Sequence, residues 1–163
     1  MASNHDKVRT GLILSPGEGK MVSAHGFRVV SKVTDELSTT QSIFEFTAPP
    51  GFDVGAHIHS THEEIFYILE GELDLRAGEQ TMHSAGPGTL MFIPPGVTHW
   101  FANPANTPAR VLFIVSPSGF ERFFEELITI LKKPGQPDTI AIGELRSKFN
   151  TTQIAPHMFR HKV

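Results

Sequence analysis

Short apolar or alternating segments, each closed by Gly, Pro or Asn, recur along the first two-thirds of the sequence. They are too short for amphipathic helices, and they have the length and alternation typical of β-strands. The segments are LIL (12–14), FRVVSKV (27–33), SIFEFT (42–47), IFYILE (65–70), ELDLR (72–76), TLMFI (89–93), THWFAN (98–103) and ARVLFIVS (109–116). This rhythm predicts an all-β sandwich or barrel over about residues 12–116.

The pattern changes to a helical one after Pro117. In SGFERFFEELITILKKPG, apolar residues recur at the i, i+3, i+4, i+7 spacing of an amphipathic helix, and Ser118 with Glu121 forms a predicted capping box. A second, weaker helix is predicted from about Thr139 to Phe149. We expect both helices to cap the barrel over about residues 118–150, within one domain that covers residues 1–163.

Composition narrows the classes of partner and cofactor. The 163 residues carry a net charge of −3 without a basic cluster, so no nucleic-acid or membrane partner is expected. The N-terminus is polar and no apolar segment approaches the about 18 residues of a membrane helix, which predicts a cytoplasmic protein. The chain has no cysteine, so any metal site must use His, Asp or Glu.

Two spaced motifs carry the polar residues that are candidates for chemistry. The first fits G-x5-H-x-H-x4-E-x6-G, through Gly51, His57, His59, Glu64 and Gly71. The second begins after a 16-residue gap and fits G-x5-P-x-G-x2-H-x3-N, through Gly88, Pro94, Gly96, His99 and Asn103. Two linked patterns are far more specific than a single glycine motif.

The spacing predicts a metal centre. Residues i and i+2 of a strand share a face, so His57 and His59 would enter one cavity, with Glu64 arriving from the next strand and His99 from the opposite wall. Three imidazoles and one carboxylate suit one divalent transition metal ion: Fe, Mn, Co, Ni, Cu or Zn. Such an ion would keep open positions for substrate or dioxygen.

The two motifs together are those of the cupin signature, and the chain resembles single-domain cupins. More narrowly it resembles the quercetin 2,3-dioxygenase-like cupins, through LSPGEGK, HIHSTHEEIFYILEGELDL, PGTLMFIPPGVTHWFAN and SPSGFERFFEEL, over roughly residues 12–150. The resemblance implies a jelly-roll barrel (double-stranded β-helix), the same four metal ligands, and a homodimer.

The activity that the resemblance implies is dioxygenation of a small enolic or aromatic, flavonol-like substrate. Glu64 would then be both a ligand and the base that accepts the substrate's hydroxyl proton. Two alternatives stay open. One is a non-redox metal-dependent cupin enzyme, such as a polyketide cyclase or isomerase, and the other is a small-molecule-binding cupin without turnover.

Strand parity indicates which side chains surround the ion. Phe66 and Ile68 share a face with Glu64, and Phe101 shares one with His99, so these three are the expected substrate-pocket residues. His62 lies in the turn between the ligands. It is an exposed turn residue, an alternative metal ligand, or a residue that supports a ligand through hydrogen bonding.

Overall fold

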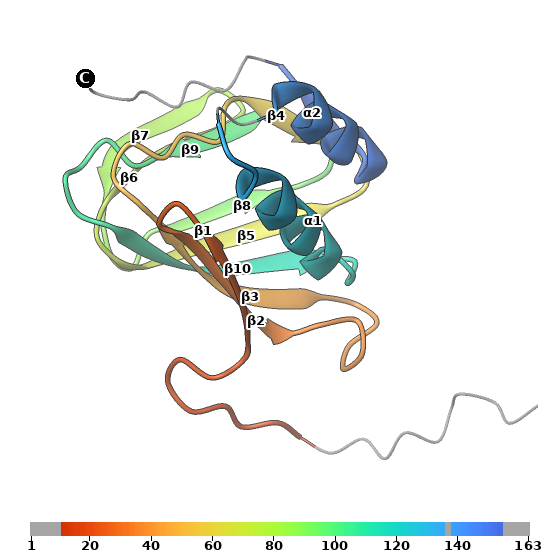
Figure 1. Ribbon diagram of the computed structural model, residues 1–163. Helices are drawn as coiled ribbons and strands as arrows, with labels where there is room; N and C mark the ends of the chain where they lie inside the picture. The colour runs from red at the N-terminus through yellow and green to blue at the C-terminus, as the bar shows by residue number, and fades with distance from the viewer. Residues whose placement is uncertain (1–10, 136–137, 155–163) are drawn as a thin grey trace, which may run out of the picture.

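The computed structural model of the chain describes residues 11–135 and 138–154, which form two facing antiparallel sheets and two helices (Figure 1). In spatial order, the six-stranded sheet contains β1 (Lys20–Ala24), β2 (Phe27–Val33), β3 (Ser42–Ala48), β10 (Ala109–Ser116), β5 (Glu63–Glu70) and β8 (Leu90–Ile93). The five-stranded sheet contains β11 (Thr151–Gln153), β4 (His57–His59), β9 (His99–Ala102), β6 (Leu73–Ala77) and β7 (Gln80–Ala85). The helices are α1 (Glu121–Leu131) and α2 (Thr139–Lys148).

The predicted all-β architecture with C-terminal helices is confirmed, with corrections at individual strands. The segment LIL (12–14) is not a strand, and Ile13 is 96% exposed. The first strand, β1, begins later, at Lys20. The prediction also missed β7, because nearly all its side chains are exposed and it therefore has no apolar alternation to detect.

Phenylalanine side chains from both sheets form a large part of the core, together with aliphatic residues. β3 and β10 alternate buried and half-buried residues along their whole length, which directs Phe44, Phe46 and Phe113 inward. The Phe66 and Phe113 rings stack 4.5 Å apart, and Phe46 meets Phe101 of the opposite sheet at 5.4 Å. Removing one such ring costs about 3–5 kcal/mol in a protein core, so this cluster holds the sheets together.

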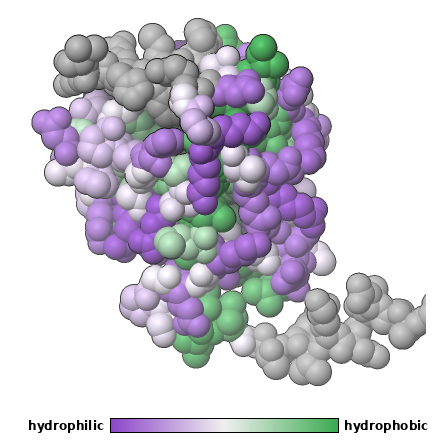
Figure 2. Space-filling model, in the orientation of Figure 1, coloured by the Kyte–Doolittle hydropathy of each residue, from purple (hydrophilic) through white to green (hydrophobic). Residues whose placement is uncertain are grey.

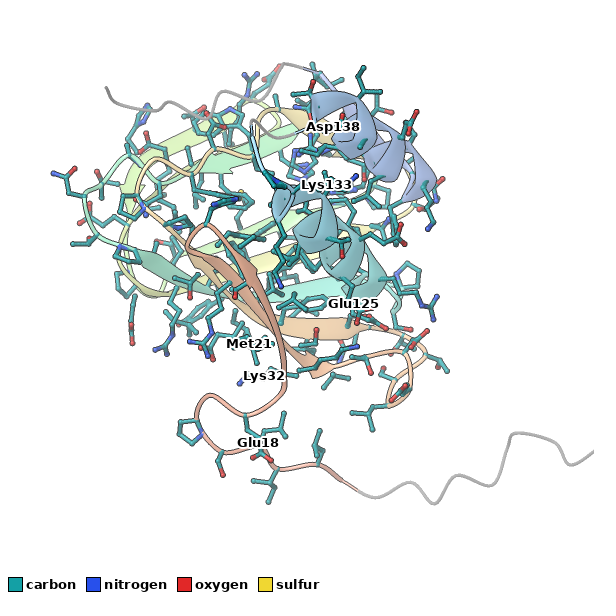
Figure 3. The ribbon with its side chains drawn as sticks, in the orientation of Figure 1. Glu18, Met21, Lys32, Glu125, Lys133 and Asp138 are labelled. Atoms are coloured by element: carbon teal, nitrogen blue, oxygen red, sulfur yellow. The ribbon has the colours of Figure 1, made fainter. Side chains whose placement is uncertain are left out.

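The two helices lie on the same side of the sheets (Figure 1). The apolar face of α1 packs inward, and the Phe124 ring meets Phe44 edge-on at 5.1 Å. At its surface, Glu125, labelled in Figure 3, forms an ion pair with Lys20 of β1 at 2.6 Å. The Asp138 carboxylate caps α2 by accepting a hydrogen bond from the Ala141 N–H at 3.0 Å.

The predicted capping box at the start of α1 is wrong. The N-cap is Phe120, and no side chain caps the helix there. Glu121 instead turns into the interior, where its carboxylate accepts hydrogen bonds from the Ser42 hydroxyl at 2.6 Å and the Asp35 N–H at 3.0 Å. Those partners come from distant segments of the chain, so the local spacing of Ser118 and Glu121 could not reveal them.

The motif residues that are not metal-ligand candidates shape the turns. Gly71 has φ +75°, and a Cβ there would lie 2.7 Å from the Pro108 carbonyl oxygen, so only glycine fits. Asn103 is 1% exposed, and its amide donates to the carbonyls of Ala48 and Thr107 and accepts from the Ala105 N–H. Gly71 and Asn103 therefore fix the backbone conformation of the turns in which they lie.

The outer surface on the helical side is mainly hydrophilic, with smaller hydrophobic patches between the polar side chains (Figure 2). Of the large apolar residues of α1, four are buried (Phe123, Phe124, Ile128 and Leu131) and two are half-buried (Leu127 and Ile130). Within residues 11–135 and 138–154, no helix is long and apolar enough to cross a membrane.

Candidate metal centre

Three strands from the two sheets bring four polar side chains together. His57 and His59 come from β4, and His57 lies directly opposite His99, the first residue of β9. Glu64 is the second residue of β5 in the other sheet. The i, i+2 spacing on β4 places both imidazoles on one face, as the sequence predicts. The centre therefore lies between the sheets.

The ligand atoms of these four residues form a compact cluster. One nitrogen from each histidine and one Glu64 oxygen lie within 4.8 Å of one another, and all four residues are buried. Nε2 of His59 and Nε2 of His99 each lie 3.0 Å from a different oxygen of the Glu64 carboxylate. Glu63, in contrast, is exposed and takes no part in the cluster.

Backbone carbonyls orient two of the imidazoles. Nδ1 of His57 lies 2.8 Å from the Gly55 carbonyl oxygen, and Nδ1 of His99 lies 3.0 Å from that of Val97. A carbonyl can only accept, so Nδ1 must carry the proton and donate. Each Nε2 is then left with a free lone pair directed at the cluster, which is the arrangement that metal-ligating histidines show.

The third imidazole is oriented by a residue that the sequence prediction missed. Nδ1 of His59 lies 2.8 Å from the hydroxyl oxygen of Thr151 on β11. That hydroxyl lies 3.2 Å from the Phe149 carbonyl oxygen and donates to it, so it accepts from the His59 N–H. A threonine 92 residues away carries no sequence signal for this contact, which depends on β11 pairing with β4.

The protonation states of the cluster also suit a metal ion. Burial lowers the pKa of His57 to about 3, assisted by the neighbouring His99, so His57 is neutral at physiological pH. Burial alone would raise the pKa of Glu64, but its contacts with His59 and His99 outweigh this effect and lower the pKa to about 2. Neutral imidazoles and an ionised carboxylate are the forms that bind metals.

The cluster contains buried polar atoms whose hydrogen bonding is not satisfied by the described residues. These atoms are His59 Nε2, His99 Nε2 and Glu64 Oε2. The 3.0 Å approaches between carboxylate and imidazoles are close, but they lack hydrogen-bond geometry. Three unsatisfied atoms converging at one point are costly in a buried site, and a divalent ion bound between the four side chains would satisfy them.

A cavity of about 90 Å³ adjoins the cluster. Its apolar lining consists of Phe27, Phe46, Phe52, Val54, Phe66, Phe101, Phe113, Phe120, Phe123, Phe124, Leu127, Leu131 and Ile142. Its polar lining consists of Asp53, His57, His59, Glu64, Arg146 and Thr151. The wall thus combines both sheets with both helices.

Two of the three residues expected in the pocket, Phe66 and Phe101, line this cavity. Ile68 lies in the core at 1% exposure and is not part of the lining. Strand parity predicts the face of a residue but not its depth along the barrel, and Ile68 is two residues beyond Phe66. The α1 and α2 contributions were missed, because a helical periodicity shows an apolar face without showing what it covers.

His62 is buried beside the cluster and does not belong to the four-residue set. Its ring packs edge-on against Phe120 at 5.2 Å and against His59 at 5.8 Å, and its Nδ1 lies 3.3 Å from the Thr61 hydroxyl. Burial lowers the pKa of His62. Its contact with the ligand His59 is therefore through ring packing.

The family match agrees with this architecture. Residues 44–115, which contain all four clustered side chains, match the family model described as "Cupin domain". Over these residues the chain is similar to cupin domains. The buried three-histidine, one-glutamate cluster is typical of a cupin metal site.

Three curated relatives match this region of the chain. The "Uncharacterized protein MJ1618" of Methanocaldococcus jannaschii is 36% identical over 72 residues, which are 44% of this chain and 57% of that protein. The "Tetracenomycin polyketide synthase protein TcmJ" of Streptomyces glaucescens is 34% identical over 68 residues, 42% of this chain and 45% of that protein. The matched region is therefore about half the length of each relative.

Solved cupin structures share the fold. The polyketide cyclase RemF from Streptomyces resistomycificus superimposes with a TM-score of 0.56 and 22% sequence identity, covering 67% of this chain and 81% of RemF. At this level of identity the comparison supports the cupin fold and leaves the reaction to be argued from the site.

Proposed function

We propose that this cupin is an enzyme that uses one divalent metal ion as a Lewis acid to act on a small enolisable carbonyl compound, without oxidation or reduction. The observation that carries the proposal is the convergence of four buried ligand atoms within 4.8 Å beside a cavity with an aromatic wall. The matched region in TcmJ, a polyketide synthase protein, supports a polyketide-like carbonyl substrate. A cyclase or an isomerase falls within this class of reaction.

The chain supplies the binding and orientation for this chemistry. His57, His59, Glu64 and His99 would hold the ion, which when bound would polarise a carbonyl oxygen and favour enolate formation. The hydrogen bonds at the three Nδ1 atoms keep the imidazoles in one tautomer and one orientation. The phenylalanines exclude water from the reacting carbonyl and contact the apolar part of the substrate.

Glu64 is primarily a ligand in this proposal. With its pKa lowered to about 2, its carboxylate holds a proton weakly, whereas an efficient general base has a pKa near the working pH. The second role expected from the sequence, as the base that accepts a substrate proton, is a further proposal. Glu64→Gln tests it if metal content and turnover are measured on the same sample.

A quercetinase-like dioxygenase is the second candidate function. The same three histidines and glutamate would serve dioxygen chemistry with a redox-active ion. The aromatic lining, with Phe46, Phe66 and Phe101 facing one another, also suits a flat substrate. The same four metal ligands are compatible with the Lewis-acid reaction and with the dioxygenase reaction. The two reactions are therefore distinguished by whether turnover consumes dioxygen.

The deciding experiment is reconstitution of the protein separately with Zn, Mn, Fe, Co and Ni. Oxygen uptake and product mass are then followed over a panel of 1,3-diketones, polyketide-like phenols and flavonols. Turnover with Zn in the absence of oxygen supports the Lewis-acid proposal. Turnover only with redox-active ions, coupled to oxygen consumption, would replace it with the dioxygenase, and metal binding without any turnover would indicate a binding protein.

A further inference from the structure

Arg146 is a buried cation in the wall of the cavity. It belongs to the last turn of α2, it is 5% exposed, and it lines the same cavity as the metal cluster. Its Nη2 donates to the Val54 carbonyl oxygen at 3.1 Å. Its Nη1 is buried and has no hydrogen-bond partner among residues 11–135 and 138–154.

Among the described residues, no carboxylate pairs with the charge of Arg146. Within the described part of the chain, none of the ion pairs includes this guanidinium. Asp53 also lines the cavity, but its Oδ1 accepts the Gly55 N–H at 2.8 Å and it makes no ion pair with Arg146. Burial lowers the pKa of Arg146 only to about 10, so it stays charged at neutral pH.

Its position at the end of a helix does not account for this burial. A cation in the last turn of a helix is favoured only modestly by the helix dipole when it lies at the surface. Lys148 gains that effect while exposed, where it pairs with Glu126 at 2.6 Å. The free-energy cost of removing an unpaired charge from water is several times larger than the gain from the helix dipole. We therefore expect the buried Arg146 guanidinium to bind a partner that the described residues do not supply.

With a divalent ion bound, the cavity would have two positively charged poles. One is the Arg146 guanidinium. The other is the metal centre, where a divalent ion with neutral histidines and one ionised glutamate would carry a net charge of about +1. Apart from Asp53 and Thr151, the rest of the lining is aromatic and aliphatic. An anion is the natural complement, because a low-dielectric wall strengthens its attraction to both poles.

We propose that the cavity binds a carboxylate-bearing substrate, with the carboxylate on Arg146 and a carbonyl oxygen directed at the metal centre. Arg146 thereby selects anionic over neutral substrates of the same shape. This inference rests on the proposed function and narrows it to small oxo-acids. The cavity, at about 90 Å³, is smaller than the roughly 150 Å³ cavity that takes up benzene, which favours small acids.

Isothermal titration calorimetry on the zinc-loaded protein tests the selection directly, with propionate and its neutral isostere propionamide as probes. Arg146→Gln removes the charge, and Lys148→Gln is the matched control, since it removes one positive charge from the same turn of α2. We expect wild-type protein to prefer propionate, and Arg146→Gln to weaken propionate binding by about tenfold or more while propionamide binding is unchanged. Lys148→Gln should retain the preference.

Equal binding of the two probes by the wild type would overturn the proposal. So would an undiminished preference in Arg146→Gln, because the carboxylate would then be held by zinc alone. If that variant does not fold, a crystal structure of the zinc-loaded wild type with propionate decides. A carboxylate within hydrogen-bond distance of Nη1 supports the assignment, and one bound only to zinc contradicts it. No turnover is measured, so the outcome is independent of the proposed reaction.

Discussion

The hydroxyl of Thr151 lies 2.8 Å from Nδ1 of His59 and links the C-terminal strand β11 to the metal centre. The contact fixes which ring nitrogen of His59 carries the proton, because the same hydroxyl donates to the Phe149 carbonyl. The segment after the barrel thus supports a ligand from within the barrel. We expect loss of the contact between Thr151 and His59 to weaken metal binding more than it destabilises the fold.

Thr151→Val keeps the side-chain shape and removes the hydroxyl. We expect zinc affinity to fall by about 10–100-fold, the effect typical of removing a hydrogen-bond partner from a metal-ligating histidine. Thr151→Ser should restore most of the affinity. Competition with a chromophoric chelator measures both values, and equal affinities in the wild type and Thr151→Val would exclude this role for Thr151.

The adjacent glutamates should differ sharply in their effect on metal content. Glu64→Ala removes a buried ligand and is expected to abolish stoichiometric metal binding. Glu63→Ala alters an exposed side chain and should leave metal content unchanged. Elemental analysis after dialysis against excess zinc measures both, and a loss of metal in the Glu63 variant would show that the assignment is reversed.

Glu121 is expected to stabilise the fold through its buried hydrogen bonds and not by capping α1. Glu121→Ala leaves the Ser42 hydroxyl and the Asp35 N–H without their acceptor, which should lower the free energy of unfolding by about 1–3 kcal/mol. Ser118→Ala should change it by less than about 0.5 kcal/mol, since no side chain caps the helix. Urea denaturation compares the two variants. A larger effect for Ser118→Ala would indicate that Ser118 does cap α1.

The metal-free protein should lose stability as the pH falls from about 6.5 towards 3. In the unfolded chain His57 takes up a proton near its ordinary pKa of 6.5, but burial lowers its pKa in the folded state to about 3. Protons therefore favour unfolding across this window, by up to about 1.4 kcal/mol per pH unit for this one group. Glu64 acts in the same direction below pH 4.5, because its folded pKa is about 2.

Chemical denaturation at a series of pH values measures this slope. His57→Gln removes the titrating imidazole and should flatten the dependence between pH 6.5 and 4.5. A slope that is identical in the wild type and in His57→Gln would show that His57 is not buried in its neutral form.

The sequence predicted the fold and the composition of the cluster because both depend on local spacing. The i, i+2 interval places His57 and His59 on one face, and Gly71, the only residue type that its turn accepts, sets the interval that identifies Glu64. Thr151 and Arg146 could not be predicted. Their contacts with His59 and Val54 span 92 residues each and exist only after the C-terminal segment packs against the barrel.

We infer that His57, His59, Glu64 and His99 together hold one divalent metal ion. Anomalous diffraction from crystals of the zinc-loaded protein tests this most directly. We predict one strong zinc peak per chain between the four side chains, at about 2.0–2.2 Å from each Nε2 and from a Glu64 oxygen. A zinc-saturated crystal without a peak at this position, or with its zinc bound elsewhere, would contradict the account.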